Sequence, residues 1–471
     1  MAKRPRPTFN NRDPARADAQ PTSTPPEAVR VSRRRLENMS SESSNASDPS
    51  SLDLSRLSLS PGSSAGTGIK EPDQAVEVPT ELESRKTLLF FGLSSERAAS
   101  IWQRWKTINE DNYRGDFGTF TRELLRSHVQ SAGCDTGEPD TDWSPNLRQI
   151  GVDERLINVI ARSGAWYDGI RLTKSAAEWV DLAIEWKWEW LLYINKASNK
   201  RAEGGIDMPP NVSPIQVRML TIPQVDEEDV TKVKYDRKND SVVDANGEPL
   251  DYIPLWRGTS RVRAEGMWAL PMRRGNFDSK NQLCNPPTDF SAKRAVHYWT
   301  PDLEGTQMYA SFAKKIAEPA GVCLVRIEVP LALLKKQSVM FLRSPDEQWK
   351  QVVWYSRRQE KMPKELQRTL TKKTLLIGDT ATRIDRKYHQ TANWSKGDEK
   401  CLLKLRSGSP VTQYVFGLRD DEDDDIDLEQ NINKQPDRTS IRMVDKPNIK
   451  LPPMETEAQK KAAAEETAGK S

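Results

Sequence analysis

A tryptophan-rich stretch, "SAAEWVDLAIEWKWEWLLYIN" at 175–195, constrains the fold more than any other part of the chain. Its apolar residues recur at the spacing of one helical face: Trp179, Leu182, Ala183, Trp186 and Trp190. Ser175 and Glu178 fit a capping box at the start of this helix. A face of this kind has to be buried, so the rest of the chain must bring other elements against it.

The same tryptophans, with Lys187 among them, would also suit a surface that stacks on nucleic-acid bases. Glu185 and Glu189 would repel phosphate, however, and the formal net charge is only +3, from 71 basic and 68 acidic residues. Burial is therefore the favoured role, and a nucleic-acid partner is not expected.

Composition divides the 471 residues into four regions. Hydrophobic residues make up only 36% of the chain, so long segments lack the apolar surface needed to fold. We expect a disordered Ser/Pro-rich tail (1–83), a helical Trp-rich region (84–200), an α+β domain (201–418) and a disordered tail (419–471), which is acidic and then of low complexity.

Two further helices are predicted in the helical region. "SERAASIWQRWKTI" at 95–108 places its apolar residues on one face. "DERLINVIARSG" at 153–164 begins with Asp153 as its N-cap and ends before Gly164. Turn residues at 197–213 predict a linker after the tryptophan-rich helix.

The remaining periodicity is that of short strands around one helix. The helix is "DLEGTQMYASFAKKIAEP" at 302–319. The predicted strands are "IQVRMLTI" (215–222), "YIPLW" (252–256), "GVCLVRIEVP" (321–330), "QVVWY" (351–355), "TLLIG" (374–378), "CLLKL" (401–405) and "QYVFGL" (413–418). This order predicts an α+β domain in which a helix packs on largely antiparallel strands.

Cysteine and histidine usage argues against a metal site. The four cysteines lie far apart and form no CxxC pair, and the chain has three histidines. No run of about 18 apolar residues and no apolar leader is present, so we expect no membrane partner and a cytoplasmic or nuclear location. The basic clusters "KRPRP" and "VSRRR" could act in nuclear import or as solubilising charge.

One polar cluster interrupts a strand-like run. "LWRGTS" at 255–260 places Arg257, Gly258 and Thr259 directly after apolar residues. This cluster could be a hairpin turn whose arginine pairs with an acidic loop. It could also be a ligand site, in which a cation and bare backbone face a phosphate-bearing molecule.

Three blocks in order resemble the ADP-ribosyltransferase-like fold, which splits NAD: "LWRGTS" at 255–260, "FSAKRAVHYWTPDLEGTQMYASFAKK" at 290–315 and "QWKQVVWYSRRQEKMPKEL" at 348–366. The resemblance covers about residues 250–418 and implies a split antiparallel sheet with NAD as the substrate. The whole chain is also similar to uncharacterised fungal proteins with Ser-rich leaders.

The resemblance implies roles for five residues. The backbone of Gly258 would bind the nicotinamide carboxamide, and Arg257 would bind a ribose or the pyrophosphate. Thr259 would fix the turn between them. Tyr298 or Trp299 would stack on the nicotinamide ring, with Tyr298 the better match.

The resemblance also calls for a glutamate just before the Val-Val pair, where this chain has Lys350 and Gln351. Gln351 and Glu347 are therefore the catalytic candidates, and Glu360 would serve only in a shifted register. Cys284 lacks the His and Asp partners of a nucleophile. The chain is thus expected to bind NAD or ADP-ribose, with weak or no mono-ADP-ribosyl transfer to a protein acceptor or NAD glycohydrolysis. The alternative is a non-catalytic scaffold acting through its helical region and tails.

Overall fold

The computed structural model describes residues 28–32, 75–108, 113–132, 142–162, 169–203, 234–236, 241–243, 248–267, 282–382, 393–396, 401–416 and 441–444. The predicted strand at 215–222, Gly164 and most of both predicted tails lie outside these residues. Within them the chain is an α+β protein.

Short capped helices make up the first half of the described chain. Their bounds are α2 (Arg85–Phe90), α3 (Ser95–Thr107), α4 (Phe117–Ala132), α5 (Ser144–Ile150) and α6 (Glu154–Ala161). The predicted helices at 95–108 and 153–164 are confirmed as α3 and α6. Asp153 caps α6, since its carboxylate accepts a hydrogen bond from the Leu156 N–H at 2.8 Å.

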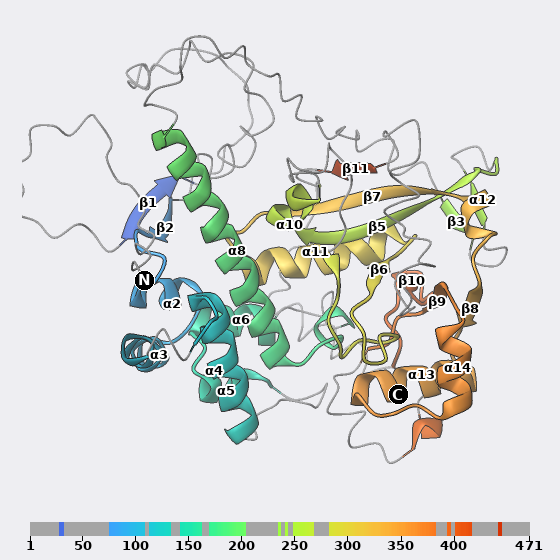
Figure 1. Cartoon of the computed structure of the whole chain (residues 1–471), viewed down its shortest axis with the longest axis horizontal. Helices are drawn as coiled ribbons and strands as arrows, with labels where there is room; N and C mark the ends of the chain where they lie inside the picture. The colour runs from blue at the N-terminus through green and yellow to red at the C-terminus, as the bar shows by residue number, and fades with distance from the viewer. Residues whose placement is uncertain are drawn as a thin grey trace, which may run out of the picture.

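The tryptophan-rich helix is confirmed as α8 (Ala176–Glu203), which runs between the other helices and the sheets (Figure 1). The capping box is present: the Ser175 N–H donates to Glu178 Oε2 at 2.7 Å, and the Glu178 N–H donates to Ser175 Oγ at 3.2 Å. The predicted linker at 197–213 begins too early, because α8 continues to Glu203. The predicted stripe is also too narrow, because Val180, Ile184 and Trp188 are buried as well. Leu182, at its edge, is only half-buried.

Two sheets follow in the second half of the chain. The first has the order β11-β7-β5 and is antiparallel, with β5 (Tyr252–Ser260) along the full length of β7 (Val322–Pro330). The second has the order β6-β10-β9-β8. Its strands are β6 (His297–Trp299), β8 (Val339–Leu342), β9 (Leu375–Asp379) and β10 (Thr412–Phe416). In it β8 and β9 are parallel, so the predicted antiparallel arrangement holds for all pairs but this one.

Helix α11 (Leu303–Ala317), the predicted helix at 302–319, connects the two halves of the molecule. It covers the β5–β7 sheet and also packs against α8 (Figure 1). Trp179 of α8 lies edge-on to Phe312 of α11, with ring centroids 4.7 Å apart. One apolar core is therefore shared, through α11, by the two predicted regions 84–200 and 201–418.

The predicted strand at 351–355 is wrong, because these residues lie in helix α13 (Glu347–Arg358). Trp349, Val352, Val353 and Ser356 are buried at helical spacing, so the Val-Val pair belongs to a helix face. Helix α14 (Lys364–Thr371) follows it. The predicted strand at 401–405 is reduced to isolated bridges from Leu402 and Lys404.

Short elements complete the described chain. They are α10 (Arg261–Gly266), α12 (Leu331–Leu334), a 3-10 turn at Trp394–Lys396, and a hairpin of β3 (Lys234–Asp236) with β4 (Ser241–Val243). Each predicted tail also contains a strand. β1 (Ala28–Ser32) pairs with β2 (Ala75–Pro79), and β11 (Ile441–Val444) pairs with β7.

Candidate functional site

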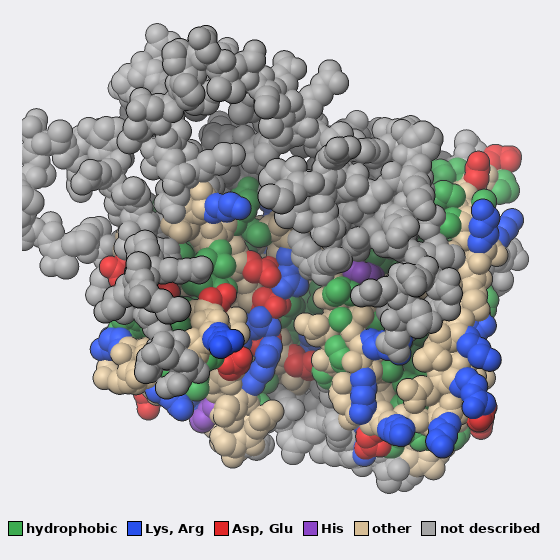
Figure 2. Space-filling view, in the orientation of Figure 1, with side chains coloured by type: hydrophobic (Ala, Val, Ile, Leu, Met, Phe, Trp, Pro, Cys, Tyr) green, Lys and Arg blue, Asp and Glu red, His purple; other side chains and the backbone are tan. Residues whose placement is uncertain are grey.

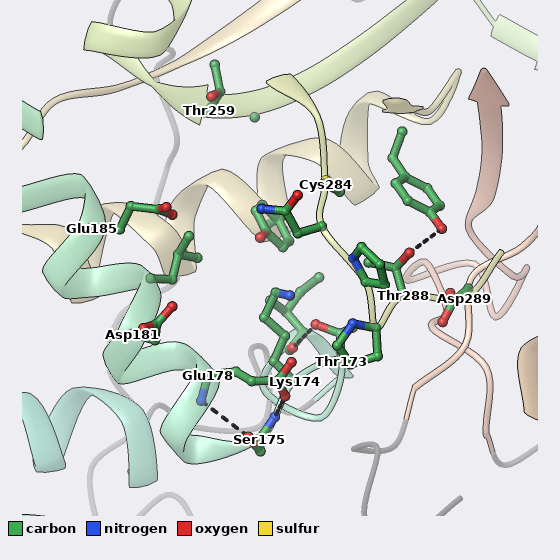
Figure 3. Close-up of a pocket in the computed structure, with 18 of the residues that line it drawn as sticks. Thr173, Lys174, Ser175, Glu178, Asp181, Glu185, Thr259, Cys284, Thr288 and Asp289 are labelled. Carbon is green, nitrogen blue, oxygen red and sulfur yellow. Dashed lines mark hydrogen bonds between the residues drawn. The ribbon is translucent and has the colours of Figure 1, made fainter. Parts of the chain in front are cut away.

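A cavity of about 790 Å³ lies between the helical half and the sheets. One wall comes from α4 and the first turns of α8, and the other comes from β5, β6, α11 and the loop at 283–289. Figure 3 shows Glu178, Asp181 and Glu185 of α8 on one side of this space, with Cys284 and Thr288 on the other. The volume falls within the range of small-molecule and cofactor sites.

Arg257 lies in this wall and pairs with no carboxylate among the described residues. Its Nη1 donates to the Tyr298 carbonyl at 3.3 Å, and its Nη2 lies 3.3 Å from Cys284 Sγ. The interpretation of this cluster as a hairpin turn is wrong, because Arg257, Gly258 and Thr259 lie within strand β5. An acidic loop paired with Arg257 is not found among the described residues. Its guanidinium lines the cavity, and no ion pair with a carboxylate of the described ranges compensates its charge.

Gly258 is required by packing against α11. A Cβ at this position would lie 2.9 Å from the Cβ of Ala310 on α11, closer than two carbons can pack. The direction in which the Gly258 N–H and C=O point follows from Trp256, two residues earlier on β5. The Trp256 N–H and C=O form hydrogen bonds with Thr300 at 2.7 and 3.0 Å, on the side of β5 away from β7. Because this direction alternates along a strand, the N–H and C=O of Gly258 point to that same side, where the cavity lies.

The other three predicted ligand residues, Thr259, Tyr298 and Trp299, also line the cavity and differ in how far they are buried. Thr259 is buried in β5. Trp299 is 1% exposed and packs within the core, so its ring has little surface to offer a ligand. Tyr298 is half-buried, and its hydroxyl lies 2.7 Å from Thr288 Oγ1 and accepts the Phe290 N–H at 2.9 Å. Burial raises the pKa of Tyr298, so the hydroxyl stays protonated.

Glu347 and Gln351, the predicted catalytic residues, lie on α13 rather than on a strand, and neither lines the cavity. Glu347 is exposed at the first turn of the helix. The strand that pairs with β6 is β10, and it brings Gln413 to the cavity. Gln413 Oε1 is buried without a hydrogen-bond partner among the described residues. The side chain beside Tyr298 and Thr300 on this strand is thus a neutral amide.

Several residues of the cavity were not predicted from the sequence, among them Lys174, Tyr309 and Gln413. Lys174 precedes the capping box of α8, and Tyr309 lies within the predicted helix at 302–319. No local pattern distinguishes either residue from a surface lysine or a core tyrosine. Cys284, for which no partner was predicted, is in contact with Arg257.

A network of ion pairs closes the end of the cavity formed by α4 and α8. Arg122 donates to Asp181 and Glu185, and Arg263 of α10 pairs with Glu185 and Glu189. Burial raises the pKa of Glu189, although Arg263 opposes the shift. Figure 2 shows acidic and basic side chains close together on this face, between the helices and the sheets.

A buried pair fixes the loop at the opposite end. The Nε of Arg357, from α13, donates to Asp289 Oδ1 at 2.7 Å, and its Nη1 donates to the Thr173 carbonyl at 3.0 Å. Asp289 Oδ2 accepts the Ala381 N–H at 2.8 Å. One arginine thus ties the loop at 283–289 to the segment that leads into α8.

Comparisons with models of known protein families, with curated proteins and with solved structures find no match for this chain. None of the helices in the described ranges is long and apolar enough to cross a membrane. Among the residues that the structure describes, no group of three or more His, Cys, Asp and Glu side chains is placed to hold a metal ion.

Proposed function

We propose that this chain binds NAD or an ADP-ribose-bearing molecule in the cavity between its helical half and its sheets. The observation that carries the proposal is that Arg257 and Gly258 lie side by side in the wall of the cavity. Arg257, which has no carboxylate partner in the part of the chain that the structure describes, lies next to a glycine whose N–H and C=O are directed into the same space. A cation and an accessible backbone edge suit a ligand with both phosphate and amide groups.

Transfer or hydrolysis at this site is weak or absent. Cleavage between nicotinamide and ribose develops positive charge, which a nearby carboxylate would stabilise. Gln413 offers only a dipole at the strand beside Tyr298, and Glu347 and Gln351 lie outside the cavity lining. The acidic side chains of α8 in the cavity are held elsewhere: Asp181 and Glu185 by arginines, and Glu178 by the capping box.

Thermal denaturation with NAD and with ADP-ribose tests the binding proposal. A ligand of the folded state stabilises it by mass action, by about 2.7 kcal/mol at one hundred times its dissociation constant. Arg257→Ala should weaken binding about tenfold or more, since hydrogen bonds to charged groups contribute about 1.5–3 kcal/mol. Arg104→Ala is the matched control, because Arg104 is exposed on α3 and lies outside the cavity.

Release of nicotinamide from NAD separates a binder from an enzyme. We expect the wild-type chain to release it no faster than the Arg257→Ala variant does. Gln413→Glu introduces the missing carboxylate and should increase release above the wild-type rate. Fast release by the wild type would contradict the assignment of a non-catalytic site.

The scaffold alternative predicts a different result. If neither NAD nor ADP-ribose changes the melting temperature of the wild-type chain at millimolar concentration, the ligand proposal fails. The chain then acts through protein contacts of its helical region and tails.

A further inference from the structure

The charges that line the cavity are not all compensated. Six basic side chains line it, from Arg122, Arg126, Lys174, Arg257, Arg263 and Arg357. Four of these pair with the carboxylates of Asp181, Glu185 and Asp289. Lys174 and Arg257 pair with none of the described carboxylates, and they are the two cations left to meet a ligand.

The nearest acidic side chain to Lys174 in the described sequence is that of Glu178, which caps helix α8. Glu178 Oε2 accepts the Ser175 N–H at 2.7 Å, and no hydrogen bond or ion pair to the Lys174 ammonium occurs among the described residues. Burial alone would lower the pKa of Lys174, but the field of Glu178 and its neighbours outweighs burial and raises this pKa. The ammonium therefore stays charged in the cavity.

Lys174 and Arg257 approach the same part of the cavity from opposite walls. Arg257 Nη2 lies 3.3 Å from Cys284 Sγ. Cys284 and Tyr309 line the same cavity as Lys174 and Arg257. Lys174 lies just before α8, whose first turn also lines the cavity.

We propose that Lys174 and Arg257 together hold the diphosphate of the ligand, so that the helical half of the chain supplies one of the two charges of the site. This inference rests on the proposed function and identifies the group of the ligand, its diphosphate, that the two cations bind. A planar guanidinium and a compact ammonium on opposite walls suit two linked phosphates, each of which has several anionic oxygens.

Binding of ADP-ribose to Lys174→Met, measured by isothermal titration calorimetry, tests the inference. The variant keeps the aliphatic stem and removes the charge, and we expect affinity to fall about tenfold to one-hundredfold. Lys174→Arg should recover part of the loss. Lys196→Met is the control, because Lys196 is exposed on α8 and lies outside the cavity.

Two further readouts separate a lost charge from a damaged fold. Inorganic diphosphate should compete with ADP-ribose in the wild type and much less in Lys174→Met. Rising salt should weaken ADP-ribose binding more in the wild type than in the variant, because the variant has one charge fewer to screen.

The outcomes distinguish the two proposals. If the wild type binds ADP-ribose, Lys174→Met binds it equally well and diphosphate does not compete, the diphosphate inference is overturned and the proposed function stands. If the wild type binds neither NAD nor ADP-ribose, yet diphosphate alone stabilises it in a Lys174-dependent way, the anion pair stands and the proposed function fails. Absence of every effect overturns both.

Discussion

Gly258 and Ala310 lie in contact across the interface of β5 and α11, with no room for a side chain on the strand: a Cβ at 258 would come 2.9 Å from the Cβ of Ala310. The approach brings α11 close to the sheet. It also leaves the backbone of Gly258 directed toward the cavity, where the proposed ligand binds.

Gly258→Ala should therefore destabilise the fold by about 1–3 kcal/mol, the usual cost of overpacking. Urea denaturation measures the effect. Ala310→Gly combined with Gly258→Ala removes the clash and should recover much of the lost stability. A Gly258→Ala variant as stable as the wild type would contradict the close approach of α11.

Arg357→Met should destabilise the chain by about 3–5 kcal/mol, because it leaves the buried carboxylate of Asp289 without its cation. The matched control is Arg368→Met, which breaks a pair with Glu365 whose side chains are 65% and 83% exposed. An exposed pair contributes at most about 1 kcal/mol. Equal losses in the two variants, measured by chemical denaturation, would refute the role of the buried pair.

Lys187 should make stability rise with pH above about 8. Burial lowers the pKa of Lys187 to about 8, and its ammonium donates to the Phe91 carbonyl at 3.3 Å. Between that pH and about 10.4 the unfolded chain keeps a proton that the folded chain has lost, so raising the pH favours the folded state.

The free energy of unfolding should gain about 1–2 kcal/mol between pH 8 and 9.5 from this residue. Denaturation of the wild type and of Lys187→Met across this window measures the gain as the difference in slope. The variant should lack that part of the slope, and Lys196→Met should retain it. Parallel curves for the wild type and Lys187→Met would show that Lys187 does not titrate in the window.

Tyr298→Phe separates the two roles of this tyrosine. It removes the hydroxyl that accepts the Phe290 N–H and contacts Thr288, and the unsatisfied buried groups should cost about 1–3 kcal/mol. The ring that would stack on nicotinamide remains, so affinity for NAD should be unchanged once the variant is folded. Tyr355→Phe is the control, because the Tyr355 hydroxyl makes no hydrogen bond among the described residues. A large loss of affinity with normal stability would instead make the hydroxyl a ligand group.

Much of the fold follows from local patterns. Capping residues and helical spacing predict α3, α6, α8 and α11, and strand-like runs predict β5, β7, β9 and β10. The error at 351–355 has a physical origin: Val352, Val353 and Trp354 suit a strand as well as a helix. Only the burial of Trp349 and Ser356 on the same side shows the helical period.

Short strands were missed because their stability comes from distant partners. β1 and β2 pair across more than 40 residues of chain, and β11 joins the edge of β7 from a segment that looks like a polar tail. None of these three strands has an alternating pattern long enough to predict the strand from its own sequence. The ADP-ribosyltransferase-like arrangement of the sheets stays a prediction.

The candidate site was predictable only on one wall. The six residues at 255–260 indicate Arg257 and Gly258 as site candidates, because a cation and a glycine follow an apolar run there. Lys174 and Gln413 become cavity residues only when α8 and β10 are brought against β5 and β6. Such long-range pairing has no local signal in the sequence.

The contact between Trp179 and Phe312 has a consequence for fragments of this protein. A polypeptide that starts after Glu203 would lack α8, and the face of α11 that carries Phe312 and Ile316 would meet water instead of tryptophan. We expect such a piece to precipitate on expression, whereas co-expression with residues 75–203 should return it to solution as a two-chain assembly.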